Sequence, residues 1–98
     1  MDKLEYQAIE MLGASNYNSW CDDCVILLEM DCWGIVKGTK TSPAKGATAK
    51  EVKDYRMRKS RAYSIIYLNT EKTHRPLISD TEDASKAWEK LKQHFRPE

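Results

Sequence analysis

The stretch from Thr48 to Asn69 constrains the fold most strongly, because its 22 residues include no glycine and no proline. Thr48 and Glu51 have the spacing of a capping box, in which each side chain accepts a hydrogen bond from the other residue's backbone N–H. We therefore predict one long helix that ends near Asn69. Its predicted inner stripe consists of Val52, Tyr55, Ala62, Tyr63 and Ile66. Ile65 and Leu68 point away from that stripe, which predicts that other elements enclose the last turns.

An earlier stretch has the same helical period. A helix is predicted to begin at a cap formed by Ser15 or Asn16 and to run to about Asp31. Its broad apolar face consists of Tyr17, Trp20, Cys21, Cys24, Leu27 and Leu28. A short second helix or turn follows, with Trp33, Ile35 and Val36 as its apolar residues. Gly38 can end it in the left-handed conformation.

The C-terminal stretch predicts a third main helix. Asp80 or Thr81 is the expected cap, and Pro97 is expected to stop the helix. Its apolar stripe consists of Ala84, Ala87, Trp88, Leu91 and Phe95. Pro76 breaks the preceding pattern and predicts a single-turn piece anchored by Leu77 and Ile78. Because no alternating run is bounded by hairpin turns, we predict an all-α fold: a small bundle of three main helices with short helical turns.

The length of 98 residues predicts a single domain over 1–98. We expect flexible ends at 1–5 and 96–98 and a connecting loop at 38–48, where glycine, proline, serine and threonine are frequent. The predicted core residues are Trp20, Leu28, Trp33, Ile66, Trp88 and Phe95. A domain of this size has little spare stability, so truncating a core tryptophan should threaten the fold.

Charge and hydropathy exclude several classes of partner. Lys and Arg number 16 against 15 Asp and Glu, so the net charge of +1 supplies no global field to attract a polyanion. No apolar stretch approaches the ~20 residues that cross a bilayer. The opening MDKLEYQAIE lacks the order of a signal peptide. We therefore predict a cytoplasmic protein with no membrane partner.

Three cysteines are the main candidates for chemistry. Cys21 and Cys24 form a CxxC pair, but Cys32, His74 and His94 do not complete a zinc-ligand spacing. The pair also lies inside a predicted helix, whereas thiol exchange of the thioredoxin type uses a CxxC at a helix start. We interpret the cysteines as reduced core residues and predict no metal and no cofactor. No nucleophile with a base and no phosphate loop emerges, so an enzyme is not expected.

A basic cluster and a second apolar face are the candidate contact sites. The cluster consists of Lys50, Lys53, Arg56, Arg58, Lys59 and Arg61. Helical projection scatters these side chains, so a solvated surface is favoured over a weak RNA contact. Val25 and Ile26 fall beside Glu29 on the side of the first helix that should face water. These three residues are a possible interface, unless the N-terminal segment covers the two apolar side chains.

The order of several motifs resembles copia-type Gag proteins of LTR retrotransposons. Their opening, roughly L-x-G-x-N-Y-x-x-W, a leucine-rich helix and L-W-x-x-V-x-G, is similar to Leu12, Gly13, Asn16, Tyr17, Trp20, Leu27, Leu28, Trp33, Gly34, Val36 and Gly38. This chain has one extra residue before Asn16 and has Cys32 where leucine often stands. YRMRKSRAYSIIYLN resembles the family's next helix, and PLISDTEDASKAWEKLKQHF resembles its ending. The resemblance spans Leu12 to Phe95.

The resemblance implies the N-terminal lobe of a capsid protein, a structural protein that assembles with itself into virus-like particles around the element's RNA. Family members continue into a second lobe and often a zinc-knuckle tail, so RNA binding is expected mainly through regions that this sequence does not include. An excised domain or a domesticated host copy are both compatible with it. The alternatives are an adaptor that captures a protein or peptide partner between helices, and an RNA-binding module that uses the basic cluster.

Overall fold

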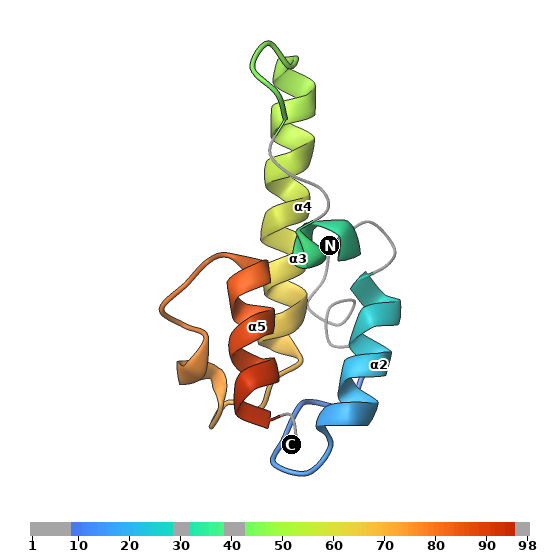
Figure 1. Cartoon of the computed structure of the whole chain (residues 1–98), viewed down its shortest axis with the longest axis vertical. Helices are drawn as coiled ribbons and strands as arrows, with labels where there is room; N and C mark the ends of the chain where they lie inside the picture. The colour runs from blue at the N-terminus through green and yellow to red at the C-terminus, as the bar shows by residue number, and fades with distance from the viewer. Residues whose placement is uncertain (1–8, 29–31, 39–42, 96–98) are drawn as a thin grey trace.

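The computed structural model describes residues 9–28, 32–38 and 43–95. Within these ranges the elements are α2 (Tyr17–Leu28), α3 (Trp33–Lys37), α4 (Ala49–Leu68), the 3-10 turn η1 (Arg75–Leu77) and α5 (Ala84–Phe95) (Figure 1). The described ranges contain no strand, only an isolated bridge between Leu12 and Thr70. The predicted all-α fold with three main helices is confirmed.

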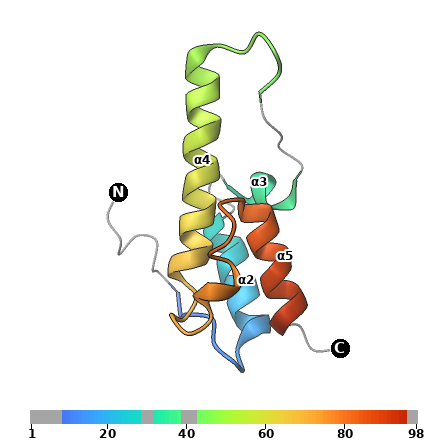
Figure 2. The ribbon, with the colours of Figure 1, turned by 90° about the vertical axis from the view of Figure 1, so that its left-hand side faces the viewer.

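The helices α2 and α5 pack beside the C-terminal half of α4, and α3 contacts both α4 and α5 (Figures 1 and 2). Their shared core consists of Leu12, Trp20, Cys24, Leu28, Cys32, Val36, Ala62, Ile65, Ile66, Ile78, Ala84, Ala87 and Leu91. Trp88 of α5 lies between two other rings, with centroid distances of 5.5 Å to Trp20 and 5.3 Å to Trp33. The predicted core residues therefore do pack in and around one cluster.

The C-terminal end of α4 holds the N-terminal segment and α2 in place. The carbonyl oxygen of Asn69 accepts hydrogen bonds from the backbone N–H of Leu12 at 2.7 Å and from the indole Nε1–H of Trp20 at 2.8 Å. The N–H of Glu71 in turn donates to the carbonyl of Leu12 at 3.0 Å. Because buried backbone groups are costly to leave unpaired, this contact fixes both segments on α4.

Arg75 donates hydrogen bonds to further backbone carbonyls at the C-terminal end of α4. Its Nε–H donates to the carbonyls of Tyr67 at 3.1 Å and Thr70 at 2.9 Å, and its Nη2 donates to that of Leu68 at 3.4 Å. Its guanidinium also lies 4.9 Å from the centre of the Tyr67 ring. A cation is favoured at a helix C-terminus, so Arg75 both ends α4 and orients the turn that leads into η1.

Asn16 sets the entry into α2. Its Oδ1 accepts from the N–H of Gly13 at 2.7 Å, and its Nδ2 donates to the carbonyl of Met11 at 2.9 Å. The Asn16 carbonyl accepts from the N–H of Trp20 and so begins the helical hydrogen bonding. In this motif Gly13 and Asn16 form the turn before α2, and Trp20 lies one helical turn after Asn16, where it bonds to Asn69.

Several predicted helix ends are confirmed. The capping box of Thr48 and Glu51 is present, and Gly38 ends α3 at a φ of 81°. The single turn predicted at Pro76 is η1, and Ile78, which directly follows it, is buried. The first helix was predicted to reach Asp31, but residues 29–31 lie outside the described residues, as do 39–42 of the loop and the predicted flexible ends 1–5 and 96–98.

The predicted cap of the last helix is wrong. The helix α5 begins at Ala84, and the Oδ1 of Asp83 accepts hydrogen bonds from the N–H groups of Ser85 at 2.8 Å and Lys86 at 3.3 Å. Thr81 instead accepts from the N–H of Asp83, and Asp80 pairs with Lys90 at 2.6 Å. Asp80, Thr81 and Asp83 are all residue types that cap helices, and α5 uses the last of them, directly before the buried Ala84.

Val52 is not a core residue, contrary to the predicted inner stripe. It is 36% exposed, Tyr55 and Tyr63 are half-buried, and Ala62 is the first buried residue of α4. In residues 49–57, here called the arm, every side chain is exposed except that of Tyr55. The arm spans about 13 Å at 1.5 Å per residue and projects beyond the other helices (Figures 1 and 2). The helical period of α4 therefore continues beyond the part of the helix whose residues are buried in the described core.

Truncations along α4 test this division. We expect Ile66→Ala to lower the free energy of unfolding by about 2–5 kcal/mol, because Ile66 is fully buried. Val52→Ala should change it by about 0.5 kcal/mol or less. Chemical denaturation of both variants measures the difference. Similar losses in the two variants would show that the arm is packed against the chain's own core.

The bond between the Trp20 indole and Asn69 can be tested with a matched pair of substitutions. Trp20→Phe removes the donor from a buried carbonyl, whereas Trp88→Phe makes the same change in a partly exposed side chain. We expect Trp20→Phe to be the more destabilising by about 0.5–1.5 kcal/mol in denaturant unfolding, because the Asn69 carbonyl loses one of its two hydrogen bonds and keeps the one from Leu12. Equal losses would mean that the indole N–H contributes nothing beyond packing.

Candidate assembly interface

The exposed side of α2 carries an isolated apolar residue. Ile26 is 67% exposed, whereas Val25 is half-buried. The segment that was the alternative cover for these two side chains lies largely outside the described residues. Glu29, the third predicted interface residue, lies outside the described residues. Asp22 and Asp23 are exposed one turn before Ile26, so this surface is both apolar and acidic.

The structure does not gather the six basic residues on one face. Lys50, Lys53 and Arg56 are exposed, while Arg58, Lys59 and Arg61 are half-buried where α4 meets the body. Successive side chains diverge by about 100° around the helix, so the cluster surrounds much of the cylinder. The Arg58 backbone also contacts Cys32, the residue directly before α3, because its carbonyl accepts a hydrogen bond from the Cys32 thiol at 3.5 Å. The arrangement fits a solvated helix that projects from the body.

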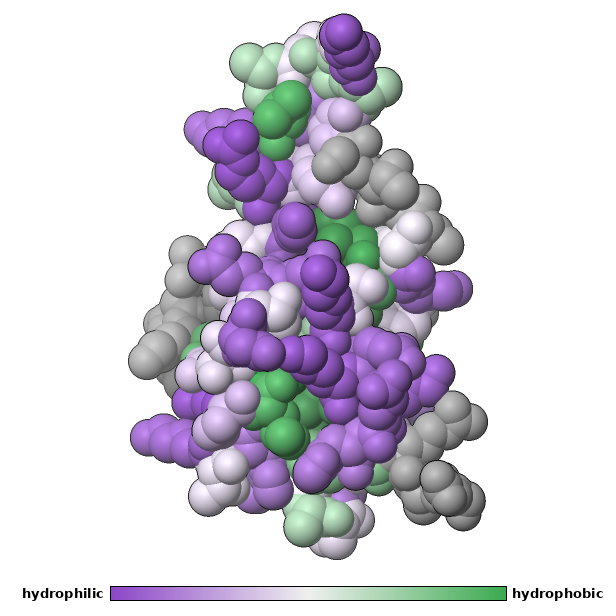
Figure 3. Space-filling view, turned by 60° about the vertical axis from the view of Figure 1, so that its left-hand side comes forward, coloured by the Kyte–Doolittle hydropathy of each residue, from purple (hydrophilic) through white to green (hydrophobic). Residues whose placement is uncertain are grey.

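Met57 is a second exposed apolar side chain, which the sequence analysis missed. It is 52% exposed on the arm. Figure 3 shows mainly polar side chains over the projecting end of the molecule, with small apolar areas among them. The signal in the sequence was the position of Met57 between Arg56 and Arg58, outside the predicted inner stripe. The sequence alone does not show that Met57 is exposed, because it does not show that the arm extends past the core.

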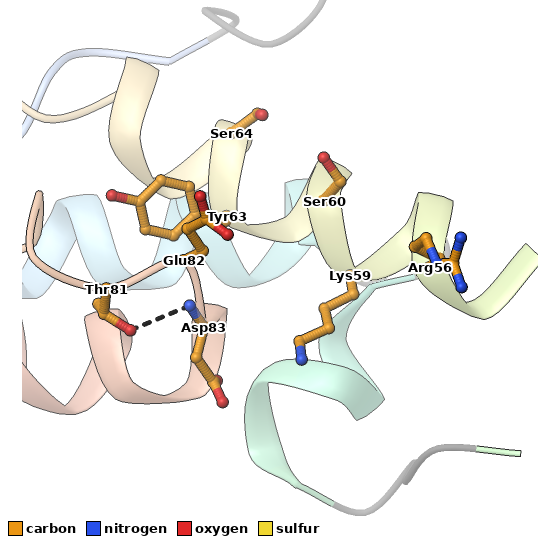
Figure 4. A pocket seen from close by; sticks show the side chains of 8 residues that line it. All are labelled: Arg56, Lys59, Ser60, Tyr63, Ser64, Thr81, Glu82 and Asp83. Atoms are coloured by element: carbon orange, nitrogen blue, oxygen red, sulfur yellow. Dashed lines mark hydrogen bonds between the residues drawn. The ribbon is translucent and has the colours of Figure 1, made fainter. Parts of the chain in front are cut away.

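An open groove lies between α4 and the segment before α5 (Figure 4). It has a volume of about 660 Å³ and is lined by Arg56, Lys59, Ser60, Tyr63, Ser64, Thr81, Glu82 and Asp83. Tyr63 joins α4 to the segment before α5, because its hydroxyl donates to the carbonyl of Ile78 at 2.8 Å. Burial, and to a lesser degree nearby Tyr67, raises the pKa of Tyr63. The groove thus has basic side chains on one wall and carboxylates on the other.

The cysteines are part of the packing. Cys24 and Cys32 are buried, Cys21 is half-buried, and all three are free thiols. Burial raises the pKa of Cys24 far above its ordinary value of 9.0, and burial also raises that of Cys21. Among the described residues, no three His, Cys, Asp or Glu side chains form a group that could hold a metal ion. The interpretation of Cys24 and Cys32 as core residues is confirmed.

The fold defines a small all-helical domain, and its candidate contact sites are all on the surface. The sequence profile of the gag-polypeptide of LTR copia-type matches residues 24–98. The chain therefore belongs to this family and has a structural role of the Gag type. The Leu12 to Trp20 motif precedes the matched range. Searches of curated proteins and of solved structures give no match. None of the described helices is both long and apolar enough to cross a membrane.

The raised pKa of Cys24 has a consequence for alkaline stability. A thiol that stays protonated in the folded state but ionises in the unfolded state stabilises the fold fully below the unfolded pKa of about 9, and this contribution is lost as the pH rises. We expect the free energy of unfolding to fall above that pH by up to about 1.4 kcal/mol per pH unit from this group. Cys24→Ala should flatten the fall in unfolding curves taken across that range. An unchanged slope would contradict the assigned cause.

Proposed function

We propose that the chain is a capsid-lobe domain whose activity is homotypic assembly into particles of the retrotransposon type. The observation that carries this proposal is the exposure of Ile26, the most exposed large apolar side chain in the described ranges. Protein interfaces place apolar residues within polar surroundings, and Asp22 and Asp23 supply such surroundings here. Membership of the Gag family supports a second copy of the chain as the partner.

The expected contact is weak in the isolated domain. Full burial of an isoleucine side chain contributes about 1.5–3 kcal/mol, and association costs several kcal/mol of rigid-body freedom. A single contact of this kind cannot hold two copies together at low concentration. Capsid shells multiply such contacts, so a weak lobe contact is compatible with a stable particle.

Replacement of Ile26 by aspartate tests the assembly surface. We expect the mass measured by light scattering to rise with concentration for the parent and to remain that of a monomer for Ile26→Asp. The substitution should leave the helical content and the melting temperature nearly unchanged, because the side chain is 67% exposed.

The matched control is Thr73→Asp, which adds the same charge at an exposed turn residue away from α2. This control should associate like the parent. Association of Ile26→Asp at parental strength would exclude Ile26 from the contact. A parent that remains monomeric throughout the concentration series would contradict assembly by this domain.

The groove favours a second candidate, a domesticated adaptor that binds a peptide of another protein. Its basic and acidic walls would suit an extended segment that carries charges of both signs. This function predicts a monomer that binds such a peptide with equal affinity in the presence of Ile26→Asp. The concentration series therefore separates the two candidates.

A further inference from the structure

Charge is unevenly distributed along the chain although the net charge is only +1. Residues 12–36 contain four acidic residues and no lysine or arginine. Residues 37–61 contain nine lysines and arginines against two acidic residues. The first range includes α2 and the second includes the arm, so two separate surfaces of the molecule carry opposite charge.

On α2 the acidic charges flank the exposed apolar side chain. Asp22 and Asp23 precede Ile26 by four and three residues, a spacing that brings all three to one side of a helix. All three are exposed, and the buried residues of α2 fall on the opposite side: Trp20, Cys24 and Leu28. These three exposed residues are called the acidic stripe.

The arm repeats this arrangement with the opposite sign. Lys50 and Lys53 precede Met57 by seven and four residues, so the three exposed side chains follow one line along α4. Of the two acidic residues in this part, Glu51 accepts hydrogen bonds from Thr48 within the capping box. Asp54 is exposed on the same side of the helix, four residues after Lys50 and three before Met57, so two lysines and one carboxylate leave this side with a net positive charge. Lys50, Lys53 and Met57 are called the basic stripe.

The arm gains almost no stability from the rest of the domain. Helices shorter than about 12–15 residues are marginal in water on their own, and most helical stability in proteins comes from packing. Among the described residues, the support of the arm comes mainly from the capping box and the continuous helix behind it, with Tyr55 as its one half-buried side chain. A partner that covers Met57 would supply the missing packing.

We propose that copies of the chain associate head to tail, with the basic stripe of one copy packed against the acidic stripe of the next. This inference rests on the proposed homotypic assembly and names the surfaces that carry it. Ile26 and Met57 form the apolar centre of the contact, and the lysines face Asp22 and Asp23 around it. The two surfaces thereby match in both polarity and charge.

Electrostatics favour this pairing of unlike stripes over contacts between like stripes. A contact between two copies of α2 would bring four aspartates together, and a contact between two arms would bring four lysines together. Like charges placed opposite one another oppose association. Because the two stripes lie on different helices, each copy offers one surface and accepts the other. Such a heterologous contact continues into a ring or a filament.

Charge reversal provides the test, with light scattering over a concentration series at low and high salt. We expect Asp22→Lys with Asp23→Lys, and separately Lys50→Glu with Lys53→Glu, each to weaken association at least about tenfold at low salt. A variant with all four changes restores opposite charges and should associate within about threefold of the parent. A mixture of the two double variants should also associate, because each then meets an oppositely charged partner.

The matched control reverses Lys72 and Lys86 to glutamate, which changes the net charge as much as the arm variant does at two other exposed lysines. It should retain parental association, which excludes a general effect of net charge. All variants change exposed positions, and circular dichroism and thermal melting check that the fold is intact. Added salt should weaken the parent, since screening reduces the attraction between exposed charges.

Failure of the four-fold variant to recover would overturn the pairing of these stripes. If the double variants associate like the parent while Ile26→Asp does not, assembly stands and the head-to-tail contact is wrong. A parent that stays monomeric contradicts both assembly and this contact. Salt-sensitive binding of single-stranded RNA that is lost with Lys50→Glu and Lys53→Glu, in a parent that does not associate, would assign the arm to RNA instead.

Discussion

The backbone carbonyl of Asn69 is the point on which the arrangement of the domain depends. It accepts two hydrogen bonds, one from Leu12 and one from the Trp20 indole, at the end of the longest helix. These bonds join the N-terminal segment, α2 and α4, while Arg75 occupies the neighbouring carbonyls and turns the chain toward α5. A helix end would otherwise leave its last carbonyls unpaired. Here those groups connect most elements of the fold.

This concentration of contacts at one end of α4 explains why the other end projects. The buried residues of α4 are Ala62, Ile65 and Ile66, all in its last two turns. The helices α2 and α5 are each 12 residues long, so they cover only part of the 20-residue α4. One continuous helix therefore forms the wall of the core and also carries an exposed surface, and the arm is the direct result of unequal helix lengths.

The helices could be predicted because their ends depend on neighbouring residues, whereas the contacts between helices could not be predicted. The capping box at Thr48 and the turn at Gly38 depend on neighbouring residues, and both are present as predicted. The bond from Trp20 to Asn69 joins residues 49 positions apart, and a helical period cannot reveal it. For the same reason the period placed Val52 in the core, since it does not show where the packing partner ends. Ile26 was predicted as a contact residue because it is apolar on the side of its helix that was expected to face water. Met57 became a candidate only once the structure showed that the arm extends beyond the core.

The small net charge and the uneven charge distribution together suit a protein that grows by adding copies of itself. A strongly charged chain resists assembly, because each added copy increases the repulsion. A chain of net charge +1 adds almost none, yet its acidic α2 and basic arm still allow strong local attraction. The low net charge argues against a polyanion as the obvious partner, but it does not argue against charge-driven binding between identical chains. For such a chain the position of the charges matters more than their sum.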